Sequence, residues 1–113
     1  MFLISGLLFQ KANANYLMDN QEYKNVTLEN IDSIDIVRYT EAGESRKKID
    51  DKAEINQIYN CLKSIKLLNE TKFSCTDNTT IYYFNLKNGS KVHIEIECNW
   101  VVFKGKNYRF SDN

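Results

Sequence analysis

The chain is 113 residues long, with 42% hydrophobic and 27% charged residues. This length is enough for one hydrophobic core and too short for two, and the apolar fraction excludes an intrinsically disordered chain. The 15 basic and 15 acidic residues cancel. No net field therefore draws the protein to nucleic acid or to acidic membranes, and we expect no nucleic-acid partner.

The N-terminal residues have the layout of a secretory signal. An apolar run from Phe2 to Phe9 is followed by the polar pair Gln10-Lys11 and by the small-x-small triplet Ala12-Asn13-Ala14. This order predicts a signal segment over residues 1–14, cut after Ala14, although no basic residue precedes the run. The run is shorter than the roughly 20 apolar residues that cross a bilayer, so we expect no transmembrane span. The alternative is that it forms part of the core of a cytosolic protein.

A hairpin is predicted after a flexible segment that we expect over Asn13–Lys24. Between Ile31 and Tyr39 the side chains alternate with a period of two, as in a strand with one apolar face. Gly43 then breaks the pattern, and Ser45 to Ile49 can return as a short, highly charged edge strand.

An amphipathic helix is predicted from Lys52 to Lys66. Asp51 and Glu54 have the spacing of a capping box at its start. Apolar residues then recur at helical spacing, so one side of the helix should face water and the other should lie on a sheet. These apolar residues are Ile55, Ile58, Leu62 and Ile65.

The remaining chain predicts short strands joined by tight turns. Asn88-Gly89 and Lys104-Gly105 supply the positive φ angles that such turns need. The predicted strands are Lys72–Cys75, Thr80–Leu86, Lys91–Asn99, Val101–Phe103 and Tyr108–Phe110. We therefore expect an α+β fold with one amphipathic helix packed on an antiparallel sheet, a C-terminal β-meander, and a single domain over residues 25–113.

Catalytic and metal chemistry have few candidate residues. His93, Glu95 and Glu97 alternate along one strand and could share a divalent ion. The commoner arrangement is a solvated strand face, and we expect no metal and no cofactor. The chain has one histidine, and phosphate loops, dinucleotide fingerprints and nucleophile elbows are absent from its sequence. We expect a protein that is not an enzyme.

Aromatic and charged residues crowd the C-terminal half, and some of them must face outward from a sheet. Such a mixture favours a recognition surface, with core and cross-strand packing of the aromatic rings as the alternative. The candidate partner-binding residues are Tyr83, His93, Glu95, Trp100, Tyr108 and Arg109.

The oxidation state of the three cysteines depends on the compartment in which the protein resides. If the protein is exported, a disulfide between Cys75 and Cys98 or between Cys61 and Cys75 is expected. In a reduced cytosolic protein all three would be thiols, and their spacing lacks the paired pattern of a structural zinc site.

Several segments carry a family resemblance. They are Ile34-Asp35-Ile36, Ile49 to Leu62, Ser74 with Asp77, Tyr82-Tyr83-Phe84, and Gly105-Lys106-Asn107-Tyr108-Arg109. Over residues 31–110 the chain resembles uncharacterised small envelope proteins and lipoproteins of Gram-positive Firmicutes, including clostridia. The resemblance implies an envelope-associated domain with a helix on an antiparallel sheet. It carries no catalytic residue onto this chain, and the cysteine that a lipoprotein signal would place after Ser5-Gly6 is missing.

These features together predict a non-catalytic binding domain, secreted or associated with the cell envelope, whose partner is a protein or an envelope component. The alternative is a cytosolic inhibitor or immunity-type protein that binds a toxin. In that alternative the apolar N-terminal run is retained as part of the core.

Overall fold

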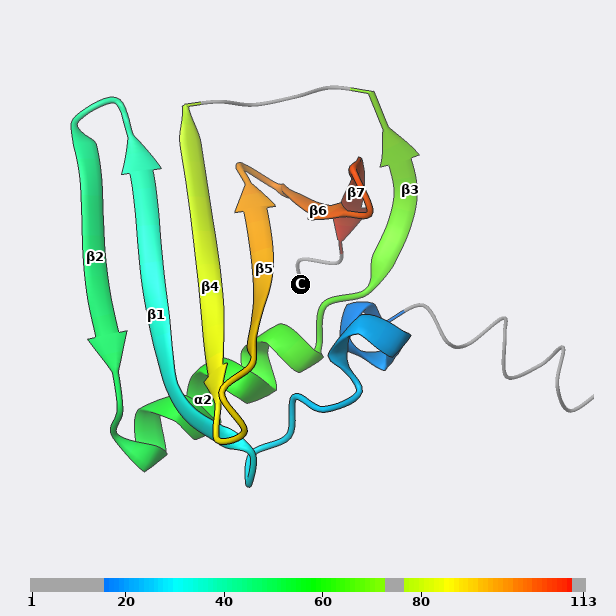
Figure 1. Ribbon diagram of the computed structural model, residues 1–113. Coiled ribbons are helices and arrows are strands. Elements are labelled where there is room, and N and C mark those ends of the chain that lie inside the picture. The colour runs from blue at the N-terminus through cyan, green and yellow to red at the C-terminus, as the bar shows by residue number, and fades with distance from the viewer. Residues whose placement is uncertain (1–15, 73–76, 111–113) are drawn as a thin grey trace, which may run out of the picture.

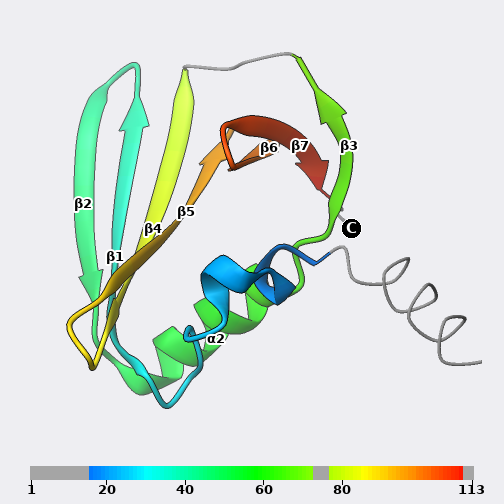
Figure 2. The same ribbon diagram turned by 45° about the vertical axis from the view of Figure 1, so that its right-hand side comes forward.

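The computed structural model describes residues 16–72 and 77–110. They form a seven-stranded antiparallel sheet, the α-helix α2 and two short 3-10 helices, η1 and η2 (Figures 1 and 2). The elements are η1 (Leu17–Asp19), η2 (Gln21–Tyr23), β1 (Ile31–Thr40), β2 (Gly43–Ile49), α2 (Lys52–Lys63), β3 (Leu67–Thr71), β4 (Asn78–Leu86), β5 (Lys91–Glu97), β6 (Trp100–Phe103) and β7 (Lys106–Phe110). The predicted signal segment over residues 1–14 lies outside the described residues.

The order of strands across the sheet is β2-β1-β4-β5-β6-β7-β3. The hairpin β1-β2 occupies one end, and β4 to β7 follow it as sequential neighbours. β3 comes before β4 in the chain but closes the opposite edge, where it pairs with β7 (Figure 1). The prediction of an α+β protein with an antiparallel sheet is therefore confirmed.

The position of β3 differs from the prediction. The first strand predicted after the helix covers Lys72–Cys75, but the strand in the structure covers Leu67–Thr71. Leu67 lies opposite Phe110, and both side chains pack against the core. This pairing between distant segments favours the extended conformation. Most of the predicted strand, from residue 73, falls outside the described residues.

Helix α2 begins as predicted and ends earlier. The Asp51 carboxylate caps it by accepting a hydrogen bond from the backbone N–H of Glu54, with N···Oδ2 3.0 Å. The helix ends at Lys63 rather than Lys66. Ile65 is instead part of a packed connection, in which its carbonyl oxygen accepts a hydrogen bond from the N–H of Leu17 at 3.0 Å.

The segment predicted to be flexible is packed where the structure describes it. Leu17 is 0% exposed, and Met18 and Tyr23 are also buried. Tyr16 and Lys66 form a β-bridge that joins this segment to the chain between α2 and β3. The prediction of a mobile segment reaching Lys24 is therefore wrong from Tyr16 onward, because its apolar side chains complete the core.

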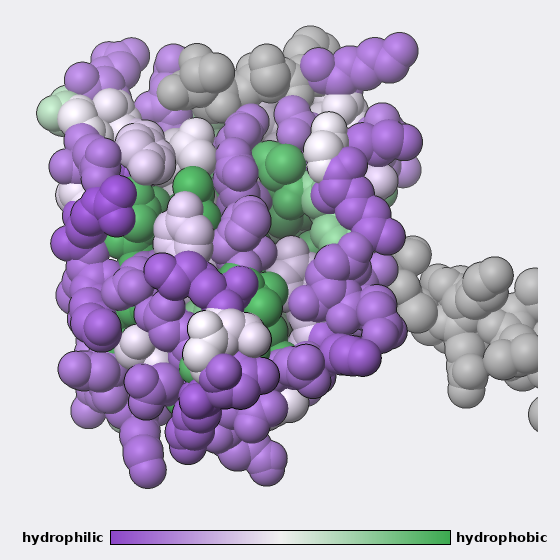
Figure 3. Space-filling view, viewed as in Figure 1, coloured by the Kyte–Doolittle hydropathy of each residue, from purple (hydrophilic) through white to green (hydrophobic). Residues whose placement is uncertain are grey.

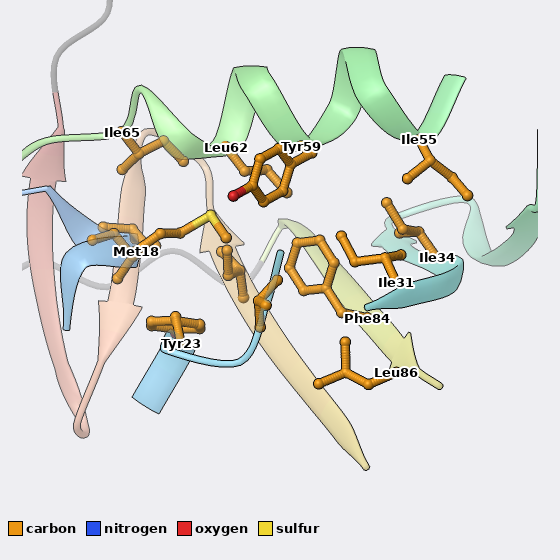
Figure 4. Close-up of a cluster of buried hydrophobic side chains, with 14 of the residues drawn as sticks. Met18, Tyr23, Ile31, Ile34, Ile55, Tyr59, Leu62, Ile65, Phe84 and Leu86 are labelled. Carbon is orange, nitrogen blue, oxygen red and sulfur yellow. The ribbon is translucent and has the colours of Figure 1, made fainter. Parts of the chain in front are cut away.

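The core lies between the sheet and α2, with η1 and η2 closing one side. Figure 4 shows Tyr59 of the helix close to the ring of Phe84 from β4, with Ile34 and Ile55 beside them. Phe84 and Ile34 are each 0% exposed. We call the sheet face that packs on α2 the inner face and the opposite one the outer face. None of the helices in the described part of the chain has the length and apolar character needed to cross a bilayer.

Candidate binding surface on the outer face of the sheet

Strand pairing decides which predicted site residues lie together. Side chains of residues directly opposite each other in neighbouring strands project from the same face. Tyr83 lies opposite His93, and Glu95, two residues further along β5, shares their face. Trp100 lies opposite Glu97 in β5 and Arg109 in β7.

Five of the six candidate residues therefore share one face. The reference point is Phe84, which alternates with Tyr83 and is buried in the core on the inner face. The five residues on the outer face are Tyr83, His93, Glu95, Trp100 and Arg109. They cross four strands, β4 to β7, and we call them the outer-face row.

The sixth candidate, Tyr108, lies on the inner face. It is opposite Val101, which is 0% exposed. Tyr108 is half-buried, packs against the core, and its ring centroid lies 6.5 Å from that of Phe103. The expectation that Tyr108 belongs to an exposed patch is corrected, because the β6-β7 register directs its side chain inward.

In Figure 1, strands β1 and β4 pass in front of α2, so Figure 3, drawn from the same side, looks onto the outer face of these strands. The surface there is largely hydrophilic, with separate hydrophobic areas over the strands (Figure 3). Val37 and Ile81 lie opposite each other on this face, and Val37 is 1% exposed. The outer face is thus a polar surface with apolar points rather than a second core.

Tyr83 lies opposite Asp35 of β1 and has three basic residues near it. Its ring centroid is 5.8 Å from that of His93, and the ammonium nitrogen of Lys91 lies 5.5 Å from the ring centroid of Tyr83. Arg46 of β2 also lies within electrostatic reach of Tyr83. A cation held near the face of a phenol ring is stabilised by the ring quadrupole, so this part of the outer face combines an aromatic centre with positive charge.

A hydrogen-bond network orders the polar side chains that lie next to Tyr83 on β1 and β4. The side-chain N–H of Asn85 donates to Asp35 Oδ2 at 2.9 Å and to Ser33 Oγ at 3.0 Å. Ser33 is 3% exposed, so this bond satisfies a hydroxyl that is shielded from water. The network holds the Asp35 carboxylate in place opposite Tyr83.

Two shallow hollows lie along the outer-face row. Trp100 and Arg109 line one of about 530 Å³, together with residues 68–71 of β3. His93 and Glu95 line another of about 390 Å³, together with Tyr23 and Lys104. Each hollow could receive a side chain of a partner, as the pockets around interface hot spots do.

The second hollow is bounded by a tyrosine with a strongly shifted pKa. The Tyr23 hydroxyl donates to the carbonyl oxygen of His93 at 3.2 Å. Burial raises the pKa of Tyr23 to about 12, and the nearby Glu22 carboxylate adds to the shift. Glu22 also pairs with Lys104 at 3.3 Å, which fixes the rim of this hollow.

The three residues of β5 that were considered as ligands of a divalent ion are His93, Glu95 and Glu97. His93, Glu95 and Glu97 alternate along β5 as predicted, but His, Cys, Asp and Glu side chains do not gather in threes anywhere in residues 16–72 and 77–110. His93 lies on the outer face, and its contacts are the Tyr83 ring and the Tyr23 hydroxyl at its carbonyl oxygen. The outer face thus presents aromatic and charged side chains.

The cysteines are divided between two states. Cys98 is disulfide-bonded, whereas Cys61 is a free, exposed thiol on α2. The predicted pairing of Cys61 with Cys75 is therefore wrong. The predicted partner of Cys98 is Cys75, which lies outside the described residues.

Sequence reasoning missed three residues of this surface. Val37 and Ile81 provide its apolar points, and Arg46 brings positive charge from the edge strand. Val37 could have been found, because it shares a strand face with Asp35 and Tyr39, opposite the face of Ile34 and Ile36. Arg46 could not, since its approach to Tyr83 depends on the pairing of three strands.

Comparisons of this chain with protein-family models, with curated proteins and with solved structures found no match.

Proposed function

We propose that this protein is a non-catalytic binding domain that is secreted or associated with the cell envelope, and that its outer face contacts a protein or an envelope component. The observation that carries the proposal is the gathering of Tyr83, His93, Glu95, Trp100 and Arg109 on one face of β4 to β7. In this proposal the last four strands act as a C-terminal meander that displays the row, while the amphipathic helix supports the opposite face.

The composition of the outer-face row favours recognition. Tyrosine, tryptophan and arginine are the residue types that most often dominate binding energy, and they do so beside hollows that exclude water. Tyr83 has a fixed environment of Lys91 and His93, and Trp100 is half-buried beside Arg109. Rings already held by their neighbours lose little conformational entropy on binding.

Export is supported by the disulfide at Cys98 and by the predicted signal segment. Disulfides persist in oxidising compartments outside the cytosol. The family resemblance to envelope proteins agrees with the same location. We therefore place the partner outside the cytoplasm.

The exposed thiol of Cys61 favours a second candidate function. A free surface thiol is more typical of a reducing compartment, where the protein would be a cytosolic inhibitor or immunity-type protein that binds a toxin. In that case the same outer face would contact the toxin. The two candidates therefore differ in location and partner rather than in the binding surface.

Location is tested by expressing the chain in a Gram-positive host and measuring its intact mass in the medium, wall and cytosol. Our proposal predicts a mature chain that starts near Asn15 in the medium or wall fraction. An uncleaved chain confined to the cytosol would overturn export and favour the inhibitor.

The binding surface is tested by retention of the purified protein on isolated cell envelopes of the same host. We expect the double variant Tyr83→Ala with His93→Ala to bind at least about tenfold more weakly than the wild type. The matched control is Gln57→Ala with Asn60→Ala, two exposed positions on α2. Equal retention of both double variants would contradict the proposed surface.

A further inference from the structure

The free edge of the sheet at β2 has features that the outer-face row does not explain. β2 is the terminal strand of the sheet and pairs with β1 on one side. Six of its seven residues are exposed, and Ile49 alone is buried. Within residues 16–72 and 77–110 no strand pairs with the other side of β2, so its main-chain N–H and C=O groups there can pair with another extended chain.

β2 is also unusually regular for an edge strand. Its register with β1 runs from Ile34 opposite Ile49 to Thr40 opposite Gly43 without a shift. The opposite edge strand, β3, is shorter, and its register shifts between Leu67 and Glu70. Its bulge and short length protect β3 from pairing, whereas β2 is protected by its charged side chains alone, which disfavour a basic partner strand but not an acidic one.

Positive charge lies along both faces of this edge. Arg46 and Lys48 project from the outer face, where Lys48 lies opposite Asp35 of β1, and Lys47 projects from the inner face opposite Ile36. The carboxylate of Glu44 is engaged by Arg46. Three consecutive cations on a regular edge strand complement an extended segment with acidic side chains.

We propose that β2 is a docking site for an acidic, extended segment of a partner protein, which adds to the sheet as an eighth strand next to β2. Main-chain pairing supplies the affinity in such β-augmentation, and the side chains select the partner. Here Arg46, Lys47 and Lys48 select glutamate- and aspartate-rich strands and repel basic ones. The inference goes beyond the outer-face function and does not depend on it.

The probe is a capped seven-residue peptide in which threonine and glutamate alternate, titrated into the full chain and followed by amide NMR. We expect shift changes that centre on residues 44–48 and slowed amide exchange in the same strand. Arg46→Glu with Lys48→Glu should weaken binding by at least about tenfold. The charge-matched control, Lys24→Glu with Lys63→Glu, changes exposed lysines away from β2 and should bind like the wild type.

A second peptide, with the same sequence but methylated on every backbone nitrogen, separates strand addition from simple attraction of charges. It should bind at least about tenfold more weakly, because it cannot donate main-chain hydrogen bonds to β2. Equal binding of both peptides, or of a threonine-lysine peptide, would overturn the proposal. So would a wild-type dimer that pairs through β2, because the site would then belong to a second copy. His93→Ala changes the outer face and leaves β2 intact. We expect it to weaken envelope binding and to leave peptide binding unchanged, so failure of one proposal can be told from failure of the other.

Discussion

Tyr83 and Phe84 are neighbours in β4, yet they serve opposite faces of the sheet. Phe84 is 0% exposed and lies against α2, whereas Tyr83 is half-buried on the outer face beside His93 and Lys91. The difference arises from the alternation of side chains along a strand. If the proposed function is right, stability and recognition are carried by alternate residues of the same strands, so each can be changed with little effect on the other.

The largest expected effect is the loss of the buried ring. Phe84→Ala should lower the free energy of unfolding by about 3–5 kcal/mol, because it removes apolar contacts and leaves a cavity between β4 and α2. Urea unfolding followed by circular dichroism measures this directly.

The matched variant, Tyr83→Ala, tests our assignment of the two residues to opposite faces. Tyr83→Ala should cost roughly 1 kcal/mol, the scale of a cross-strand pair, because its ring packs on His93 rather than in the core. A loss as large as that of Phe84→Ala would mean that the outer face is part of the core.

The next effect concerns the N-terminal segment. Leu17 is 0% exposed and donates its N–H to Ile65, so Leu17→Ala should cost about 2–5 kcal/mol. Tyr16, its exposed neighbour, is the control, and Tyr16→Ala should change stability by less than about 1 kcal/mol. If both variants unfold like the wild type, the segment is not part of the core.

The first hairpin and the start of the helix could be predicted because their signals are local. The alternation from Ile31, the turn at Gly43 and the capping pair Asp51 and Glu54 all lie within a few residues of one another. β3 and the packed segment around Leu17 could not be predicted in this way. Their conformation depends on Phe110 and Ile65, which are distant in sequence, and such contacts leave no periodic pattern.

All five residues of the outer-face row were predicted as candidates, and for three of them the alternation along a single strand was enough. Tyr83, His93 and Glu95 follow from β4 and β5 alone. Tyr108 was misplaced because its face depends on the register of the β6-β7 hairpin, which is set by the turn at Lys104-Gly105. A shift of one residue in such a register moves a side chain to the other face.

The buried phenol of Tyr23, which donates a hydrogen bond to the carbonyl oxygen of His93, makes the free energy of unfolding depend on pH. The folded pKa is about 12 and the ordinary value is 10.0. Between these values the unfolded chain releases the phenol proton while the folded chain keeps it, so stability falls as pH rises, by up to about 1.4 kcal/mol per pH unit. Below pH 10 the contribution is fully present and constant.

Tyr23→Phe tests this dependence. Unfolding at pH 8, 10 and 11 should show a shallower loss for the variant than for the wild type, after a cost of roughly 1 kcal/mol for the missing hydrogen bond to His93. Identical slopes for the two proteins would contradict a buried, protonated Tyr23.

The smallest effect lies at the helix start, far from the outer face. Asp51→Ala removes the cap at the N–H of Glu54 and should cost about 1 kcal/mol. Asp50→Ala changes the same charge at the preceding exposed position and should cost no more than about 0.5 kcal/mol. Envelope binding should be unchanged in both variants, because α2 supports the inner face.

Site-specific crosslinking is the direct test of the proposed contact between the outer face and the partner. A photoreactive phenylalanine analogue would replace Tyr83 or His93 on the outer face, and Gln57 or Asn60 on α2, in the full chain exposed to host envelopes. The account predicts the same discrete adduct from both outer-face positions, lost when unlabelled wild-type protein competes, and none from the helix positions. Adducts that form equally from α2, or from α2 alone, would contradict it.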